Sequence, residues 1–387
     1  MSVTAAAGFR AAGVTAGLKA SGRPDVAVVV SDGPSFAAAG VVTRNRFQAA
    51  PVLWTQQVLR AGAVRAVVLN SGGANACTGP DGFADTHRTA EHVADRLGIG
   101  AGEVAVCSTG LIGVRLPLDR LLAGVDAAVP ALCATGGPAA AEAIMTTDSR
   151  PKQAQRTVAG PSGSWTVGGM AKGAGMLAPG LATMLVLLST DADAPPDVLD
   201  AVLREAVRLT FDRVDTDGCM STNDTVLLLA SGASGVAPAA ADLQEAVTAV
   251  CADLARALVA DAEGAEHEVT VTVSQAATEP DALDVAREVA RSLLVKTAIF
   301  GRDPNWGRIL AAVGVSAAQF DPDRVDVAVN GVWVARGGAA GDDRSLVDLS
   351  GREVAIDVVL GAGCAQAAVL TTDLTHAYVH ENSAYST

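Results

Sequence analysis

Short runs rich in Val and other aliphatic residues recur along the whole chain and constrain its fold more than any other feature. Each run is short enough to be a buried strand, and most end near Gly, Asp, Asn or Ser, which favour turns. The predicted strands are Val26–Val30, Ala66–Leu69, Val104–Val106, Met184–Leu188, Val226–Leu229, Val269–Val273, Val325–Val329 and Val354–Val359.

Segments with helical periodicity lie between several of these runs. The predicted helices are Asp85–Leu97, Asp197–Leu209, Ala241–Ala260 and Asp281–Leu294, the last carrying apolar residues at the spacing of one helix face. Strands and helices therefore mix, which predicts an α/β or α+β fold. The Pro, Ala and Gly residues of Gly136–Ala141 and Gly235–Ala241 predict loops.

The composition limits the kinds of partner. The 387 residues are enough for one large domain or two ordinary ones, and because aromatic residues make up only 3%, the core must consist of Ala, Val and Leu. The net charge of −14 argues against nucleic-acid binding, which needs a basic surface. Small anionic substrates remain compatible, because a site can be locally positive in an acidic protein.

Cysteines, histidines and apolar runs indicate a cytoplasmic protein without metal. The six cysteines form no C-x-x-C pair, so we expect reduced, mostly buried thiols. The five histidines have no metal-ligand spacing, and we assign no metal. The first residues lack the pattern of a secretory signal peptide. The apolar runs are far shorter than the ~20 residues that a membrane-spanning helix needs.

The most unusual local stretch is residues 168–183. Five glycines and Pro179 precede Thr183, which opens the apolar run Met184–Leu188. Glycines let a backbone adopt positive φ and pass close to a ligand. A Thr at the first position of a rigid strand is well placed for chemistry at the edge of a pocket.

A Thr hydroxyl is a poor nucleophile unless a base lies beside it. Peptide cleavage between Ala182 and Thr183 would free an α-amine on the same residue, and such an amine has a pKa of roughly 7.7–8.0. We therefore predict self-cleavage at this bond, after which Thr183 provides both nucleophile and base. The local pattern alone leaves the plainer alternative open, in which Thr183 is an ordinary strand residue and the glycines form a turn.

Motifs along nearly the whole chain favour self-cleavage, because they resemble the ornithine acetyltransferase family, the bifunctional glutamate N-acetyltransferases of arginine biosynthesis. The matching segments are 8–14, 16–19, 43–45, 49–52, 70–79, 108–113, 145–148, 172–179, 182–185, 221–225, 261–264, 294–297, 303–308 and 381–387. Gly180, Leu181 and Gly73 stand where the family often has Asn, Met and Asn. None of these three positions is the nucleophile.

The resemblance implies a layered α/β fold of the ornithine acetyltransferase and DmpA-like type, with N-terminal-nucleophile chemistry. It implies an α chain, Met1–Ala182, and a β chain, Thr183–Thr387, that fold as one unit and assemble as two α and two β chains. Thr183 would attack the acetyl group of N2-acetyl-L-ornithine, and L-glutamate would then take the acetyl group from Thr183.

The resemblance also implies the remaining site residues. Thr109 and Gly110 would form the oxyanion hole, and the substrate would contact Thr147, Lys172, Thr183, Glu263, Asn382 and Thr387. Lys172 is one of only four lysines, with Lys19, Lys152 and Lys296, and would hold a substrate carboxylate. Each position also has a plain alternative: a strand-to-loop turn, a solvated lysine, a helix cap, an exposed acid or a frayed tail.

The acetyl transfer that the resemblance implies needs no cofactor, because exchange of one amide for another needs no ATP. The sequence leaves open whether acetyl-CoA is a second acetyl donor and whether Thr146 replaces Thr147. Three other functions stay open: a self-processing aminopeptidase or amidase, a paralogue of specialised metabolism, and an uncleaved protein that is no enzyme.

Overall fold

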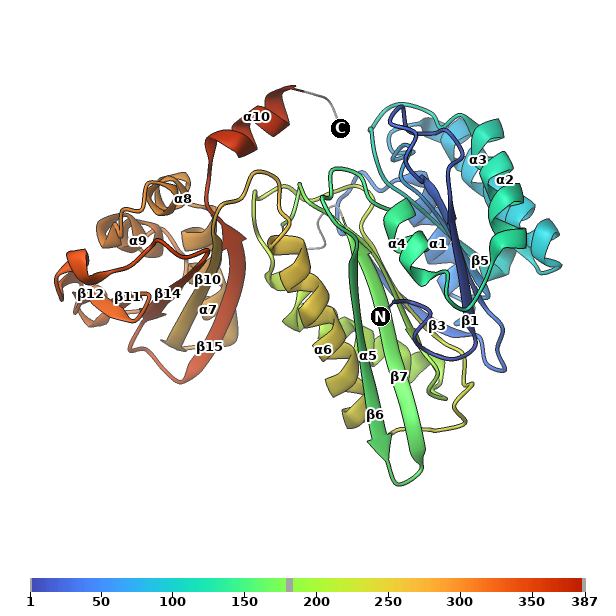
Figure 1. Ribbon diagram of the computed structural model, residues 1–387. Coiled ribbons are helices and arrows are strands. Elements are labelled where there is room, and N and C mark those ends of the chain that lie inside the picture. Colours follow the sequence, from blue (N-terminus) through green and yellow to red (C-terminus); the bar gives the residue numbers. More distant parts are fainter. Residues whose placement is uncertain (1, 179–183, 385–387) are drawn as a thin grey trace. The chain divides into compact units, whose positions relative to one another are not determined.

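The computed structural model describes residues 2–178 and 184–384. It divides into two compact units (Figure 1). Of the described residues, the first unit contains those up to Asp212 and residues 219–258, and the second contains residues 213–218 and 259–384. The predicted cleavage point after Ala182 therefore falls within the sequence of the first unit, and the assignment of separate α and β chains stays a prediction.

The first unit has a four-stranded sheet in the order β1-β2-β4-β5. The strands are β1 (Phe9–Val14), β2 (Val26–Ser31), β4 (Ala66–Asn70) and β5 (Val104–Ser108). β4 and β5 run parallel, so their carboxyl ends, Asn70 and Ser108, are paired at one edge of the sheet. All residues of β2, β4 and β5 are buried, which explains their unbroken apolar sequences.

A five-stranded sheet in the order β3-β9-β8-β7-β6 completes the strands of this unit. The strands are β3 (Ala37–Val42), β6 (Lys152–Gly160), β7 (Gly163–Lys172), β8 (Leu185–Thr190) and β9 (Thr225–Ala230). β7 and β8 are antiparallel neighbours, with Lys172 opposite Leu185, and β8 runs parallel to β9. The two strands on either side of the predicted cleavage point are thus directly hydrogen-bonded.

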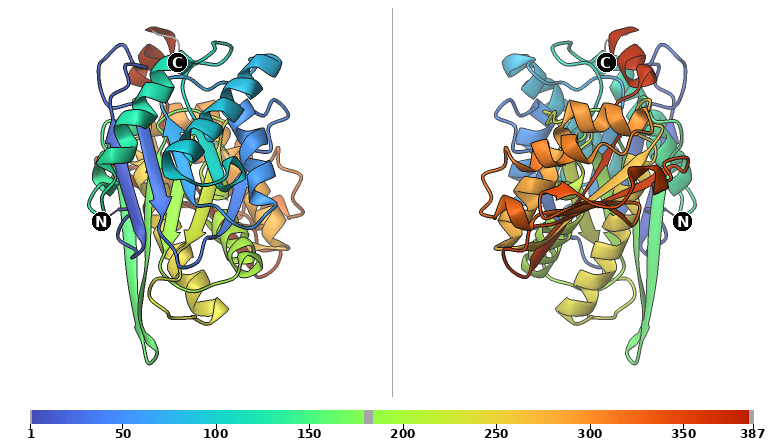
Figure 2. Two further views of the ribbon diagram at one scale, coloured as in Figure 1. Left: turned by 90° about the vertical axis from the view of Figure 1, so that its right-hand side faces the viewer. Right: turned by 90° about the vertical axis from the view of Figure 1, so that its left-hand side faces the viewer.

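Helices from the described part of the first unit cover its two sheets. They are α1 (Ala50–Leu59), α2 (Gly79–Leu97), α3 (Leu118–Ala128), α4 (Gly137–Ala143), α5 (Pro196–Leu209) and α6 (Ala240–Val259). α2 and α3 pack on the four-stranded sheet (Figure 2, left), and α5 packs on β3. One apolar cluster, built mainly from Val, Ala and Leu, takes residues from both sheets.

Helix α4 corrects the prediction of a loop at Gly136–Ala141. Pro138 stands in the first turn of this helix, where its missing N–H costs nothing, and the alanines after it favour a helix. The helix packs very closely on β1, because a Cβ at Gly136 would lie 1.8 Å from the carbonyl oxygen of Ala11. Close packing against the backbone of β1, rather than a turn, explains why residue 136 is a glycine.

The second unit contains a six-stranded sheet in the order β13-β12-β11-β14-β10-β15. The strands are β10 (Glu268–Ala276), β11 (Asp326–Val329), β12 (Val332–Arg336), β13 (Ala339–Ala340), β14 (Glu353–Val359) and β15 (Ala365–Thr372). Its helices are α7 (Glu279–Arg291), α8 (Leu293–Phe300), α9 (Trp306–Val313) and α10 (His376–Ala384). α7 packs on β10 and β15, and α9 packs on α7 and β11 (Figure 2, right).

The predicted α/β class is confirmed, and each predicted strand overlaps a strand of the structure. Two of them, Met184–Leu188 and Val325–Val329, begin one residue before β8 and β11. The predicted helix Asp281–Leu294 is wrong in one detail, because it is two helices separated at Ser292. Ser292 has an extended backbone and its hydroxyl accepts the N–H of Val295, so it caps α8. The expectation of mostly buried cysteines is also wrong, since only Cys107 and Cys251 are buried and the other four are exposed.

Candidate active site

Three of the sequence motifs meet where β4, β5 and β9 approach one another. The amide of Asn70 donates to the hydroxyl of Ser108 at 2.7 Å, across the paired ends of β4 and β5. The amide of Asn223, just before β9, donates to the carbonyl oxygens of Ser108 at 2.8 Å and of Ala74 at 2.6 Å. All three polar residues are buried, so these bonds fix the local backbone in one arrangement.

This arrangement presents Thr109 and Gly110. The Thr109 N–H donates to the carbonyl oxygen of Asn70 at 3.0 Å, whereas the Gly110 N–H makes no hydrogen bond within the described residues. Gly110 has φ of +131°, and a Cβ there would lie 2.9 Å from the backbone of Gly73. Only glycine fits such a position, and it leaves a backbone donor beside the hydroxyl of Thr109, as an oxyanion hole requires.

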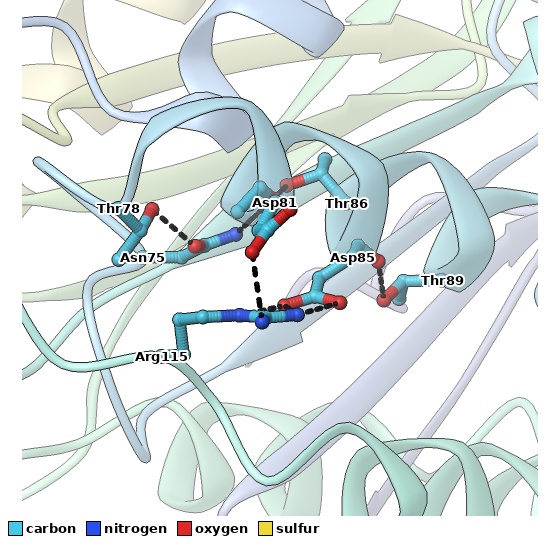
Figure 3. A network of polar contacts seen from close by, with 8 residues as sticks. Asn75, Thr78, Asp81, Asp85, Thr86, Thr89 and Arg115 are labelled. Atoms are coloured by element: carbon cyan, nitrogen blue, oxygen red, sulfur yellow. Dashed lines mark hydrogen bonds and ion pairs between the residues drawn. The ribbon is translucent and has the colours of Figure 1, made fainter.

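The loop that follows Gly110 is anchored to α2 (Figure 3). The guanidinium group of Arg115 donates to both carboxylate oxygens of Asp85, at 2.8 to 2.9 Å, and to Asp81 at 3.3 Å. The bidentate pair with the buried Asp85 gives the loop a fixed orientation.

A second set of contacts in the same view holds the turn that leads into α2. The amide of Asn75 donates to the carbonyl oxygen of Gly82 at 2.8 Å and to the hydroxyl of Thr86 at 2.9 Å. Its own carbonyl accepts the hydroxyl of Thr78 at 2.7 Å. This turn contributes the carbonyl oxygen of Ala76, which accepts the N–H of Gly113 from the anchored loop.

Lys172 is the last residue of β7 rather than a loop residue, and it is only 1% exposed. Its Nζ atom donates to the Oγ1 atom of Thr109 at 3.3 Å. A lysine this deeply buried is rarely kept without a charged or polar partner. The alternative of a solvated lysine is therefore wrong, and the structure brings together two of the predicted site residues.

Asp148 is the main carboxylate next to this lysine. It accepts the Nζ of Lys152 at 2.6 Å, the N–H of Gly173 at 2.7 Å and the N–H of Thr146 at 2.9 Å. Burial alone would raise the pKa of Asp148, but Lys172 and Lys152, together with the hydrogen bonds, lower it to about 2. A charged Asp148 thus joins the loop that carries Thr147 to the end of β7.

Lys19 supports the other side of the same loop. Its Nζ atom donates to the carbonyl oxygens of Pro24 at 2.8 Å and of Met145 at 2.6 Å, just before Thr146. Burial lowers the pKa of Lys19 to about 8, although the carboxylate of Asp25 opposes the shift. Two lysines and one aspartate therefore fix the loop of Thr147 from both ends.

Asp224 occupies the junction between β8 and β9 and is completely buried. Its Oδ1 atom accepts the N–H of Met184 at 2.9 Å, whereas Oδ2 has no hydrogen-bond partner in the described part of the chain. Burial raises the pKa of Asp224 well above its usual range, against the opposing effects of the Met184 N–H, Lys172 and Ser221. A carboxyl group of this kind is unusual in a folded protein.

The second unit brings together two further predicted site residues. The amide of Asn382, on the exposed side of α10, donates to the Oε2 atom of Glu263 at 3.0 Å. Gly264 has φ of +61°, and a Cβ there would lie 2.2 Å from the backbone nitrogen of Tyr378. The start of α10 is thus packed directly on the loop of Glu263. Asn382 lies in this helix, so the alternative of a frayed tail is wrong for Asn382.

The remaining predicted site residues, Ala182, Thr183 and Thr387, lie outside the described residues. The structure also identifies residues that sequence reasoning did not single out, namely Asp148, Asn223 and Asp224. Each belongs to a motif that the sequence analysis quoted, but its role depends on burial and partners that no spacing reveals. One feature of the sequence could have drawn attention to Lys19 and Lys152, namely that lysine is rare in this chain.

The described residues contain no group of three or more His, Cys, Asp and Glu side chains that could hold a metal ion. In the described ranges no helix combines the length and the apolar character that crossing a bilayer demands.

The structure thus places the buried Lys172 against the hydroxyl of Thr109, next to Gly110, in an α/β protein. The ArgJ family model matches residues 10–387. An arginine biosynthesis bifunctional protein ArgJ from Streptomyces coelicolor is 63% identical over 386 residues and covers 100% of both chains. Another from Mycobacterium tuberculosis is 62% identical and covers 99% of this chain and 96% of its own. The chain belongs to the ArgJ family, and the prediction of an acetyltransferase of arginine biosynthesis is confirmed.

A solved structure of an ornithine acetyltransferase from Mycobacterium tuberculosis, complexed with ornithine, is also similar. It is 62% identical, the match covers 48% of this chain and 96% of that chain, and the TM-score is 0.45.

Proposed function

We propose that the protein cleaves itself between Ala182 and Thr183 and then transfers an acetyl group from N2-acetyl-L-ornithine to L-glutamate. The observation that carries this proposal is the contact between Lys172 and Thr109, at the end of the strand that precedes the cleavage point. It combines an oxyanion donor with a cation that suits the α-carboxylate of an amino acid.

Self-cleavage begins when the Thr183 hydroxyl attacks the carbonyl carbon of Ala182. The peptide nitrogen leaves as an amine and an ester forms, which water hydrolyses to a carboxylate on Ala182 and a free hydroxyl on Thr183. The Thr109 hydroxyl and the Gly110 N–H stabilise the oxyanion in this step and in acetyl transfer, because both steps pass through similar tetrahedral intermediates.

Acetyl transfer is ping-pong in this scheme. The α-amine of Thr183 takes the hydroxyl proton, the hydroxyl oxygen attacks the acetyl carbonyl, and ornithine leaves with the proton. Glutamate then attacks the acetyl ester and leaves as N-acetyl-L-glutamate. Water must be kept from the ester, because hydrolysis would waste the acetyl group.

Substrate contacts follow from charge. Lys172 holds the α-carboxylate and Thr147 contributes a hydroxyl. Glu263, which accepts the Asn382 amide, suits the side-chain ammonium of ornithine. Thr387 is proposed as a further contact.

We further propose an assembly of two α and two β chains in the cytoplasm, without a cofactor. Acetyl-CoA is a candidate second donor of the acetyl group.

The decisive experiment combines a gel with an assay. Wild-type protein should show two fragments, the second beginning Thr-Met-Leu-Val, and Thr183→Ala should give one full-length, folded, inactive chain. Acetyl transfer should require glutamate, with acetylornithine or acetyl-CoA supplied separately as donor. Fragments from Thr183→Ala would reject the cleavage mechanism, and rapid acetyl release without glutamate would identify an amidase instead.

A further inference from the structure

The two amino acids of the proposed reaction end in opposite charges. Ornithine and glutamate share an α-carboxylate and an α-nitrogen, but the side chain of ornithine ends in an ammonium group and that of glutamate in a γ-carboxylate. Glu263, proposed for the ammonium group, would repel the γ-carboxylate. Because Lys172 is assigned to the α-carboxylate, which both substrates carry, the second carboxylate of glutamate needs another cation.

Lys19 lies in the connection between β1 and β2, which packs against the segment that supports Gly110. A Cβ at Gly72 would lie 2.3 Å from the Cβ atom of Leu18, the neighbour of Lys19. A Cβ at Gly110 would lie 2.9 Å from the backbone of Gly73, the next residue after Gly72. Two adjacent glycines therefore separate the connection that carries Lys19 from the glycine of the proposed oxyanion hole.

The amine of Lys19 has one donor more than it uses. A protonated lysine has three N–H donors and no acceptor. Two of them donate to the carbonyl oxygens of Pro24 at 2.8 Å and of Met145 at 2.6 Å. Among residues 2–178 and 184–384 no third group, and no carboxylate, accepts a hydrogen bond from this Nζ atom. The half-buried side chain is thus held at a fixed place with one donor left for a ligand.

The charges that act on Lys19 make a locally positive site in this acidic protein. They are the carboxylates of Asp25 and Asp148 and the cations of Arg23 and Lys172. Both carboxylates have donors of their own: Asp25 accepts three backbone N–H groups, and Asp148 accepts a lysine amine and two backbone N–H groups. Burial lowers the pKa of Lys19 to about 8, so the amine is still mainly protonated at neutral pH.

We propose that the ammonium group of Lys19 binds the γ-carboxylate of glutamate and thereby selects the acceptor of the acetyl group. This assignment rests on the proposed function. Lys172 and Lys19 then hold the two carboxylates of one dicarboxylic amino acid, and the charge of Lys172 already acts on Lys19. The γ-carboxylate accepts the third N–H of the amine, which completes its hydrogen bonding. Ornithine has no second carboxylate, so its binding does not use Lys19.

Lys19→Met tests the assignment, because it removes the charge and nearly keeps the length of the side chain. L-Glutamine has the shape of glutamate without the charge, so the decisive quantity is the ratio of kcat/KM for glutamate to kcat/KM for glutamine. This ratio should fall about 10- to 100-fold, as expected when a hydrogen bond between charged groups is removed. Lys19→Arg keeps the charge and should keep most of the wild-type preference.

The ratio also separates selection of the acceptor from a purely structural role. Lys19→Met loses the bonds to Pro24 and Met145, which steady the loop of Thr147. That loss alone would weaken the use of acetylornithine and of both acceptors by the same factor, and it would leave the ratio unchanged.

Arg23→Met is the matched control. Arg23 lies in the same connection, is exposed, and its charge also acts on Lys19. The variant removes one positive charge from the same region and should keep the wild-type preference for glutamate. Circular dichroism, the melting temperature and the two fragments on a denaturing gel establish that both variants are folded and processed.

Three results would overturn the assignment: a wild-type enzyme that uses glutamine as well as glutamate, a Lys19→Met enzyme with the wild-type ratio, or an equal loss of preference in Arg23→Met. Failure of the proposed function looks different, because wild-type protein would then be uncleaved or would transfer no acetyl group from acetylornithine. If Lys19→Met misfolds, Lys19→Gln provides the same test, since its amide is still a hydrogen-bond donor but has no charge, and the preference should again be lost.

Discussion

The Nζ atom of Lys172 lies 3.3 Å from the Oγ1 atom of Thr109, so the end of β7 and the loop after β5 share one buried contact. The same hydroxyl is proposed to stabilise an oxyanion, and the same ammonium is proposed to bind a carboxylate. A lysine in this position therefore influences both binding and chemistry, and substitutions should separate the two effects.

Lys172→Met should raise the KM for acetylornithine by about 10- to 100-fold, because a hydrogen-bonded charge pair with the substrate carboxylate contributes roughly 1.5–3 kcal/mol. Steady-state kinetics measure the effect. The fold should survive, since Asp148 keeps Lys152 and the Gly173 N–H as partners. An unchanged KM in a folded variant would reject the role of Lys172 in binding.

Incubation with acetylornithine in the absence of glutamate should leave one acetyl group, about 42 Da, on the peptide that begins at Thr183. Mass spectrometry of the digested protein locates the label. Adding glutamate should remove it. A label on another residue, or kinetics that require both substrates to be bound together, would contradict the ping-pong scheme.

Gly110→Ala should slow both self-cleavage and acetyl transfer, because a Cβ would lie 2.9 Å from the backbone of Gly73 at a φ of +131°. The displaced N–H would no longer meet the oxyanion, and loss of one such donor typically costs 10²–10³-fold in rate. Gels report cleavage and an activity assay reports kcat. Gly102→Ala is the control, since a Cβ there has no atom within 4 Å; equal behaviour of the two variants would count against the assignment.

Gly264→Ala tests the packing of α10 on the loop of Glu263. A Cβ would lie 2.2 Å from the Tyr378 nitrogen, so the helix must shift and the contact between Asn382 and Glu263 should be lost. We expect a higher KM for acetylornithine and faster removal of the C-terminal residues by carboxypeptidase, with self-cleavage unchanged. Gly351→Ala, at a position with open space, should behave like wild type. Slow, wild-type digestion of Gly264→Ala would show that α10 had not moved.

The buried Asp148 should make stability depend on pH in the acid range. Its pKa is lowered from 3.8 to about 2, so its contribution is complete above the unfolded value and is lost as the pH falls through about 2. Wild-type protein should lose about 2 kcal/mol of unfolding free energy from this group between pH 4 and pH 2, as measured by urea unfolding. Asp148→Asn should lack this part of the pH dependence; an identical slope in both proteins would mean that Asp148 is not charged in the folded state.

Some of the strands that the sequence predicted, such as β2 and β5, are completely buried, and complete burial leaves an unbroken aliphatic run. Others, such as β10, show the alternation of a strand with one buried face. The hairpin of β6 and β7 escaped prediction. β6 is largely exposed and polar, and β7 contains two consecutive glycines. Gly168 packs closely on the backbone of Ser2, and Gly169 packs on the side chain of Leu188. Local patterns carry little information about strands of that kind, because their stability comes from long-range pairing.

The site residues also divide into those that the sequence indicated and those that only the structure identifies. The family motifs pointed to Thr109, Gly110 and Lys172, and the structure joins Lys172 to Thr109. No sequence pattern indicated a role for Asp224, because an aspartate in a polar motif normally predicts a turn. Its significance depends on complete burial and on the Met184 N–H, and both appear only when two strands distant in sequence become neighbours.

The direct pairing of β7 with β8 has a consequence for how the molecule is made. As long as the peptide between these strands is intact, they find each other as parts of one chain, and folding does not depend on protein concentration. Once that peptide is cut, unfolding releases two separate polypeptides, and their reunion becomes a second-order encounter that competes with aggregation. The lifetime of the mature enzyme would then depend on a slow rate of unfolding. Renaturation from urea should succeed readily for the Thr183→Ala precursor. For the processed protein it should succeed poorly, or only at high protein concentration.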